Sequence, residues 1–408
     1  MWFLKKLVVI ACLLLASACV FGKELQFDKL DVSQGLSNNW ITCFFKDSRG
    51  LMWVGTWDGL NKYDSYTFTN YLPNETDTAT IAGSIINAIY EDHNGNLWVA
   101  TSGNYISVYD RQTEKFNTFM PTGDGLDRSI ESAYCFLRMN DSILLIGTEH
   151  GLDVYNFSTQ TIKRLQHKPN QPGTIAGNIV NDILMTKDKV VWFATDQGLS
   201  KLTGNQFRFR NYVANQGNKA SICHNYINCL HESGTGQLLI GTKSGLSIYR
   251  PDKDSFTSKL TYGQGQRPQT ASFIRDIADN GQGEIYVATD NGLVVMAEGK
   301  EEFFLPNYID VKSISSTVIT RLFYDEFGTL WAGTYNGGIN YTNNLRNKFK
   351  HIKVGKGDLT NPYVYSVTED KAGNIWIGTE KGLNVYGPTT GEFNALMPLF
   401  KKWPPFKR

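Results

Sequence analysis

Apolar and polar residues recur along the chain in one short pattern that repeats every 45 or 47 residues. In each copy an apolar or aromatic residue starts a short strand-like run, which is followed by Thr and usually by a Gly-Leu pair. We call the first residue of this pattern the tryptophan position. The eight copies place there Trp53, Trp98, Leu145, Trp192, Leu239, Tyr286, Trp331 and Trp376. Strand-type repeats of this length are typical of a β-propeller.

The pattern within one copy predicts four strands. In the first copy, apolar Ile41 and Phe44 lie twelve and nine residues before the tryptophan position and indicate a half-buried first strand. Asp47 with Gly50 three residues later predicts a tight hairpin turn into a second strand. A third strand starts at the Gly-Leu pair, and a fourth starts at an aromatic or aliphatic residue. Each copy therefore predicts one four-stranded blade of an all-β propeller.

The segment from Phe27 to Asp31 has the pattern of a fourth strand but precedes the first full copy. In closed propellers, strands from both chain ends often complete one blade, which removes an exposed sheet edge. This favours a seven-bladed ring over residues 23–345, with residues 346–408 as an additional repeat that begins a second, truncated propeller. The fourth-strand pattern of the segment from Phe27 to Asp31 recurs at Phe349 to Ile352. An eight-bladed ring is the alternative.

Residues 1–22 have the pattern of a secretory signal peptide, with Lys5 and Lys6 before an apolar run and small residues after it. We therefore expect a periplasmic or otherwise exported protein, with a lipid anchor at Cys19 as a less favoured possibility. The 40 basic and 39 acidic side chains nearly balance, so a nucleic-acid partner is not expected. No later apolar run reaches the length of about 18 residues that a membrane helix needs.

No motif in the sequence indicates catalysis, a metal or a cofactor. The six histidines fall in different copies without metal-ligand spacing. Neither a nucleophile elbow nor a glycine-rich phosphate loop is present. Cys43, Cys135 and Cys229 occupy one slot in alternate copies, too far apart for disulfides, and are interpreted as buried thiols.

The first copy resembles the two-component regulator propeller repeat. The resemblance lies in Gly35-Leu-Ser-Asn-Asn39, Trp53-Val-Gly-Thr56 and Gly59-Leu-Asn-Lys-Tyr63, and it extends over nearly all of the mature chain. It implies the periplasmic sensor region of hybrid two-component histidine kinases, in which two seven-bladed propellers precede a β-sandwich, a membrane helix and a kinase core. Many such sensors respond to oligosaccharides. The chain resembles the first half of such a sensor and lacks the phospho-accepting histidine segment.

The resemblance implies a non-catalytic, ligand-sensing module that binds an oligosaccharide or other small ligand and forms a homodimer through its propellers. Membrane contact is expected only through the N-terminal signal or through a missing C-terminal part. Two alternatives stay open, a propeller enzyme of the lyase or glycoside-acting type and a protein-interaction scaffold. The Asp-to-Trp spacing is similar to the Asp box of sialidases, but its recurrence in several copies favours a structural turn.

Candidate ligand residues lie in two sets of loops. The loop that enters the first strand and the turn between the second and third strands lie on the same face of a propeller, and this face usually binds ligands. Aromatic rings stack on sugars and amides bind their hydroxyls. The candidates are Asn39, Trp40, Trp57, Asp58, Asn178, His224, Asn225, Tyr226, Arg275, Tyr335 and Asn336. Arg275 is expected to face the channel, where it binds an acidic sugar or pairs with Asp276 or Asp182.

Overall fold

The computed structural model describes residues 25–103, 105–119, 132–204, 206–260, 273–342, 359–387 and 392–396. Its contacts divide the chain into two units, Met1–Asn343 and Asn344–Arg408, and we describe each unit by itself. The predicted signal peptide at 1–22, the lipid-anchor candidate Cys19 and the strand expected at Phe349 to Ile352 lie outside the described residues. Apart from the short 3-10 helix η1 (Val32–Gln34), the regular elements in the described ranges are β-strands.

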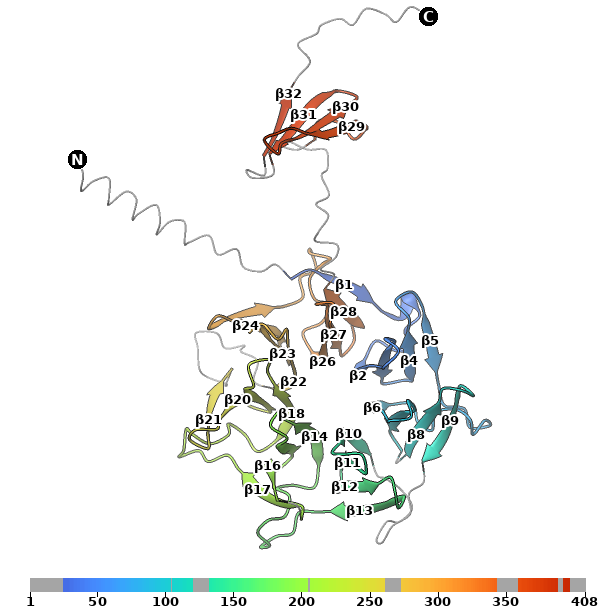
Figure 1. Cartoon of the computed structure of the whole chain (residues 1–408), viewed down its shortest axis with the longest axis vertical. Helices are drawn as coiled ribbons and strands as arrows, with labels where there is room; N and C mark the ends of the chain where they lie inside the picture. The colour runs from blue at the N-terminus through green and yellow to red at the C-terminus, as the bar shows by residue number, and fades with distance from the viewer. Residues whose placement is uncertain are drawn as a thin grey trace, which may run out of the picture. The chain divides into compact units, whose positions relative to one another are not determined.

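In the first unit, the described residues form seven four-stranded antiparallel sheets around a central channel (Figure 1). Blade 1 comprises β2 (Ile41–Lys46), β3 (Met52–Thr56), β4 (Leu60–Tyr63) and β5 (Phe68–Tyr71), and blade 2 comprises β6 (Ile86–Glu91), β7 (Leu97–Thr101), β8 (Tyr105–Asp110) and β9 (Lys115–Phe119). Blade 3 comprises β10 (Ala133–Arg138), β11 (Ile143–Thr148), β12 (Gly151–Asn156) and β13 (Thr161–Leu165), and blade 4 comprises β14 (Val180–Met185), β15 (Val191–Thr195), β16 (Gly198–Thr203) and β17 (Arg208–Tyr212). Blade 5 comprises β18 (Ile227–Glu232), β19 (Leu238–Thr242), β20 (Gly245–Arg250) and β21 (Ser255–Lys259), and blade 6 comprises β22 (Ile274–Asp279), β23 (Ile285–Thr289), β24 (Gly292–Ala297) and β25 (Lys300–Phe304). Blade 7 comprises β26 (Ile319–Tyr324), β27 (Leu330–Thr334), β28 (Ile339–Thr342) and β1 (Phe27–Leu30).

The ring closes through its N-terminal strand. β1 pairs antiparallel with β28, with Phe27 opposite Thr342 and Leu30 opposite Ile339. Phe27 is 1% exposed and packs in a core shared by blades 6 and 7. The innermost strand of blade 7, β26, in turn contacts β2 of blade 1. The prediction that the Phe27 segment supplies the outer strand of the last blade of the ring is confirmed.

The Asp turn predicted between the first two strands of a blade is structural. In blade 1, Asp47 Oδ1 accepts the amides of Arg49 and Leu51 at 3.0 and 2.9 Å. The indole Nε1 of Trp53 donates to Asp47 Oδ2 at 2.8 Å, and Gly50 has a φ of 85°. One carboxylate therefore holds both the turn and the buried Trp in place.

Small residues after the apolar pair of the second strand let neighbouring blades approach. A Cβ on Gly55 would lie 2.4 Å from Cys43 Sγ and 2.8 Å from Ile86 Cγ2 of blade 2. At the ring closure, a Cβ on Gly333 of blade 7 would lie 2.6 Å from Ile41 Cγ2 of blade 1. These distances show that neighbouring blades approach closely here, because a side chain at either glycine would separate the blades.

The described part of the second unit contains one four-stranded sheet, formed by β29 (Val364–Glu369), β30 (Ile375–Thr379), β31 (Gly382–Gly387) and β32 (Glu392–Leu396). β29 is exposed along its whole length. Among its apolar side chains, Tyr365 is 74% and Val367 62% exposed. This sheet thus repeats the blade topology without burying its first strand.

Candidate functional site

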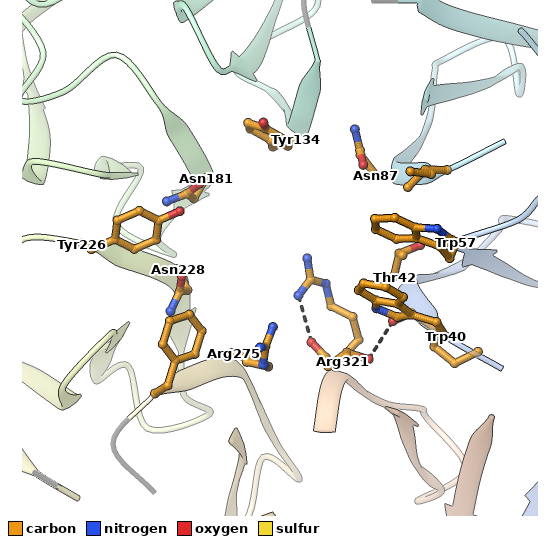
Figure 2. A pocket seen from close by; sticks show the side chains of 14 residues that line it. Trp40, Thr42, Trp57, Asn87, Tyr134, Asn181, Tyr226, Asn228, Arg275 and Arg321 are labelled. Atoms are coloured by element: carbon orange, nitrogen blue, oxygen red, sulfur yellow. Dashed lines mark hydrogen bonds between the residues drawn. The ribbon is translucent and has the colours of Figure 1, made fainter. Parts of the chain in front are cut away.

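A cavity of about 330 Å³ lies in the central channel of the ring (Figure 2). Six of the seven blades contribute a polar or charged side chain from the first strand, and the seventh contributes a tyrosine. The lining residues are Trp40, Ile41, Thr42, Trp57, Ile85, Asn87, Tyr134, Asn181, Tyr226, Asn228, Phe273, Arg275, Thr320 and Arg321.

One hydrogen bond, repeated from blade to blade, brings the two predicted loops together. In blade 1 the amide of Trp57, in the turn after β3, donates to the carbonyl of Trp40, just before β2, at 3.0 Å. In blade 5 the amide of Lys243 donates to the carbonyl of Tyr226 at 3.0 Å. Each such bond fixes two adjacent side chains at the mouth of the channel. The expectation that both loops share one face of the ring is therefore confirmed.

A β-bulge in the first strand of every blade of the ring supplies the inner lining. In blade 1 the pairing with β3 shifts between Ile41 and Cys43, so the intervening Thr42 is unpaired. Such bulges redirect side chains. The residues at this position all line the cavity, namely Thr42, Asn87, Tyr134, Asn181, Asn228, Arg275 and Thr320.

Aromatic rings flank the cavity on two sides. Trp40 and Trp57 stack with ring centroids 3.9 Å apart and an interplanar angle of 5°. Tyr335 of blade 7 packs on Trp40 at 4.2 Å, and Trp57 and Tyr335 are 44% and 45% exposed. Figure 2 shows Tyr226 across the cavity from this pair of tryptophans. Exposed ring faces beside hydroxyl and amide groups suit a ligand with both apolar and polar surfaces.

Some of the polar side chains also join neighbouring blades. The amides of Asn181 and Asn228 donate at 2.7 Å to the carbonyls of Ile227 and Ile274 in the next blade. Each Asn side chain therefore keeps its own carbonyl oxygen as an acceptor at the cavity wall. Tyr134 donates to Glu149 at 3.2 Å, and burial together with the Glu149 charge raises the pKa of Tyr134 to about 12.

Arg275 does not form the ion pair predicted from the sequence. Its Nε donates to Asp290, in the turn after β23 of the same blade, and its guanidinium lies 4.9 Å from the centroid of the Phe273 ring. The predicted partners are already used, because Asp182 and Asp276 accept backbone amides of the next blade at 2.8 and 2.9 Å. The prediction of a pair with Asp276 or Asp182 was wrong.

A second cavity of about 230 Å³ shares five of the seven bulge residues and reaches Asp182, Asp276 and Arg321. Burial and the charge of Asp276 raise the pKa of Asp182 to about 6, although its hydrogen bonds and Arg321 oppose the shift. Burial likewise raises the pKa of Asp276. The inner part of the channel therefore contains two carboxyl groups that are harder to ionise than usual.

The structure places the predicted candidates in different settings. Four of them line the cavity, namely Trp40, Trp57, Tyr226 and Arg275, and Tyr335 lies beside them on Trp40. Four have structural roles. The side chains of Asn39, Asn178 and Asn225 accept the amides of Val32, His167 and Ala214 from the preceding segment, and His224 Nδ1 accepts the amide of Tyr226. The exposed Asp58 and Asn336 do not contribute to the cavity lining.

Of the residues at the bulge position, the sequence reasoning assigned only Arg275 to the channel. Asn87, Asn181 and Asn228 lie there, eleven residues before the tryptophan position and between apolar neighbours of a predicted strand. An amide or hydroxyl at the same slot in copy after copy was the available signal. An alternating strand pattern does not reveal a bulge, so the other residues of this slot were not assigned to the channel.

Comparison with protein families identifies the repeat. The family model for the two-component regulator propeller matches residues 35–58, 80–103 and 358–381, which belong to the first, second and last copies. The chain contains two-component regulator propeller repeats. The resemblance seen in the first copy is therefore shown.

Similar proteins agree with this assignment. A histidine kinase P4 from Formosa agariphila is 33% identical over 75 residues, which is 18% of this chain and 6% of that protein. The extracellular domain of a putative hybrid two-component system from B. thetaiotaomicron superposes with a TM-score of 0.66 at 24% identity, covering 91% of this chain and 49% of that one. The chain thus spans about half the length of that structure.

The propeller fold alone does not decide the function. A streptogramin B lyase structure shares it, with a TM-score of 0.55 at 12% identity over 78% of this chain and 97% of the lyase. Among the described residues, no group of three or more His, Cys, Asp or Glu side chains is placed to hold a metal ion. The described ranges also contain no helix with the length and apolar character needed to cross a membrane.

Proposed function

We propose that this chain is an exported, non-catalytic sensor module of a two-component system and that it binds an oligosaccharide in the central cavity. The observation that supports this most is the combination of exposed aromatic faces at the mouth with a ring of amides and hydroxyls from the bulges. Aromatic faces stack on the apolar side of a sugar, while amides and hydroxyls bind its polar edge.

The size and the charge of the cavity fit this proposal. Its volume of about 330 Å³ lies at the lower end of the range for ligand pockets, roughly 300 to 1,000 Å³. Arg275 and Arg321 are the charged residues in its lining among the described residues, and Arg275 is paired with Asp290. The other residues that line the cavity are uncharged, which favours a ligand recognised by hydrogen bonds and stacking.

The site lies where ligand binding can affect the whole ring. Asn181, Asn228 and Thr320 line the cavity and also donate to the next blade, so a ligand that contacts them changes bonds between blades. In a longer sensor, a ligand that prefers one packing of the propellers in a dimer would shift the equilibrium toward that packing.

Calorimetric titration of the purified chain with an oligosaccharide panel tests the proposal, with chromatography of the mixtures to detect products. We expect binding without turnover. Asn87→Ala removes a cavity amide for which the structure shows no hydrogen bond within the described residues, and we expect it to weaken binding at least tenfold. Trp57→Ala should do the same.

Asn336→Ala is the matched control, since this exposed amide lies outside the cavity lining, and it should bind like the unmodified chain. Formation of a cleaved product would replace the sensor with an enzyme. Binding that neither Asn87→Ala nor Trp57→Ala affects would place the ligand elsewhere.

A further inference from the structure

The groove between blades 4 and 5 is open, whereas the equivalent groove between blades 1 and 2 is filled. The open groove has a volume of about 490 Å³, and Trp192, Glu232, Pro251, Lys201 and Tyr249 are among its lining residues. It lies outside the central cavity and shares no lining residue with it. The difference between the two grooves can be traced to single residues.

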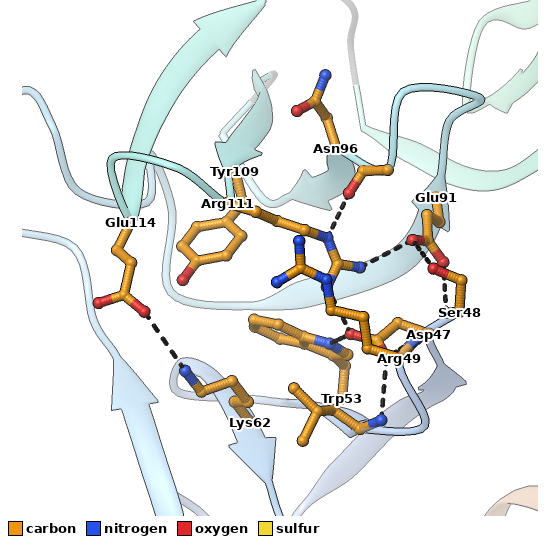
Figure 3. Close-up of polar contacts among 12 residues, drawn as sticks. Asp47, Ser48, Arg49, Trp53, Lys62, Glu91, Asn96, Tyr109, Arg111 and Glu114 are labelled. Carbon is orange, nitrogen blue, oxygen red and sulfur yellow. Dashed lines mark hydrogen bonds and ion pairs between the residues drawn. The ribbon is translucent and has the colours of Figure 1, made fainter.

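Arg111 fills the groove between blades 1 and 2 (Figure 3). Its two terminal nitrogens lie 2.9 Å from Asp47 Oδ2 and 3.0 Å from Glu91 Oε1, and its Nε donates to the carbonyl of Gly95. The Arg111 side chain is only 8% exposed. The indole of Trp53 also donates to Asp47 Oδ2, so this carboxylate accepts from both groups.

The walls of the two grooves correspond residue by residue. Trp192 takes the place of Trp53. The ring centroids of Trp192 and Tyr249 are 5.0 Å apart, and those of Trp53 and Tyr109 are 5.4 Å apart. Glu232 takes the place of Glu91 at the end of a first strand. Each of these two glutamates accepts a backbone amide of the preceding blade at 2.7 Å through Oε2.

The residue that follows the third strand decides whether a groove is filled. Arg111 follows Asp110, the last paired residue of β8, and Pro251 follows Arg250, the last paired residue of β20. Phe157, at this position in blade 3, packs its ring 5.9 Å from that of Trp98. An arginine and a phenylalanine thus reach the neighbouring blade, whereas the short ring of Pro251 leaves space.

The open groove lacks the counterparts of both Asp47 and Arg111. Thr186 stands where blade 1 has Asp47, and its hydroxyl bonds to the backbone of Val190. Within the described residues, Trp192, which is 2% exposed, therefore has no acceptor for its indole N–H. Glu232 Oε1 likewise has no donor among these residues in place of Arg111. This N–H is not enclosed by the described residues, so it is available to a ligand in the groove.

We propose that the groove between blades 4 and 5 is a second ligand site and that it binds a saccharide through two of its hydroxyl groups. The missing pair consists of one acceptor for the indole, which is Asp47 Oδ2 in blade 1, and one donor to the glutamate, which is the terminal nitrogen of Arg111 that binds Glu91. A sugar carries several hydroxyl groups, and each of them can accept or donate. One hydroxyl accepts from Trp192 and the other donates to Glu232.

The groove contains charges of both signs. Replacing Asp47 by Thr186 removes one negative charge, and replacing Arg111 by Pro251 removes one positive charge. The lining also includes Asp188, Glu232 and Asp252 together with Lys201 and Arg250, so neither sign dominates strongly. A guanidinium ligand would satisfy Glu232 but leave the indole of Trp192 without an acceptor.

The indole N–H resonance of Trp192 in the full chain, assigned with Trp192→Phe, reports directly on the site. We expect it to shift on titration with methyl glycosides of glucose, galactose or mannose, and to stay unmoved with cyclohexanol, which has a single hydroxyl. The double variant Thr186→Asp, Pro251→Arg recreates the filled groove and should weaken binding at least tenfold. A melting curve verifies that this variant folds.

Asn87→Ala, in the central cavity, should leave the Trp192 shift unchanged, which separates this site from the one proposed above. An unmoved Trp192 resonance with every glycoside would overturn the proposal. So would a shift produced by L-arginine in preference to the glycosides, or unweakened binding by the folded double variant.

Discussion

The first copy of the repeat, β2–β5, and the last, β29–β32, build the same turn with the same bonds. The indole of Trp53 donates to Asp47 at 2.8 Å, and that of Trp376 donates to Asp370 at 2.9 Å. Hydrogen bonds from Trp376 and Asn374 lower the pKa of Asp370 to about 2. The local geometry of a blade is therefore encoded within a single copy.

The two copies differ in what they bury. Ile41, in the first strand of the first copy, is fully buried, whereas Val364, at the same repeat position, is 44% exposed. Trp53 is 1% exposed and packs with Ile86 and Leu97 of blade 2. Contacts with a neighbouring blade thus supply the burial that the last copy lacks in the described residues. Hydrogen bonds specify the blade, and apolar contacts between blades stabilise it.

The largest expected difference between the two copies is at the tryptophan position. Trp53→Ala should cost about 4 kcal/mol in the free energy of opening of β3, because it empties a fully packed site. Trp376→Ala removes the same atoms from a half-buried site and should cost about 1 kcal/mol in β30. Native-state hydrogen exchange measures both values. Equal costs for the two substitutions would contradict the conclusion that contacts between blades stabilise a blade.

The second largest effect is expected at Arg111, which joins two neighbouring blades. It links blades 1 and 2 through Asp47 and Glu91, whose side chains are 0% and 12% exposed. Arg111→Ala leaves these buried carboxylates without their partner and should reduce the free energy of unfolding by about 3 kcal/mol. Arg49→Ala, at an exposed position in the Asp turn, is the control and should cost less than about 0.5 kcal/mol. Urea denaturation distinguishes these outcomes.

Asp182 should give an effect no larger than that of Arg111, and this effect depends on pH. Its pKa in the folded chain is about 6, above the usual value of 3.8, so folding favours the neutral form. The resulting stability is fully present below about pH 4 and is lost as the pH rises through about 6, a change of about 3 kcal/mol. Asp182→Ser introduces the residue that the last copy has at this position, Ser366, and should flatten this dependence in melting curves. An unchanged slope would rule out Asp182 as its source.

The sequence predicted the features that a single copy determines. The four strands and the Asp47 turn follow from spacing and residue type, and the structure confirms them. Ring closure by the Phe27 segment was also predictable. This segment has the pattern of a fourth strand, but the first three strands of a copy do not precede it.

The site was predicted only in part, because its residues depend on contacts between distant segments. Trp40 and Trp57 were found, since both lie in loops that precede or follow recognisable strands. Asn178 and Asn225 look like ligand residues in the sequence, yet they bond to the segment that leads from the preceding blade. A side chain's partner across such a distance is not visible in local spacing.

The pairing of β1 with β28 has a consequence for how the ring is made. The two strands lie at opposite ends of the first unit, so the contact with the greatest sequence separation is the one that closes the circle. During synthesis β1 has no partner until β28 has emerged, and β1 can meanwhile pair with other chains. Ring closure is therefore expected to be the slow, aggregation-sensitive stage of maturation.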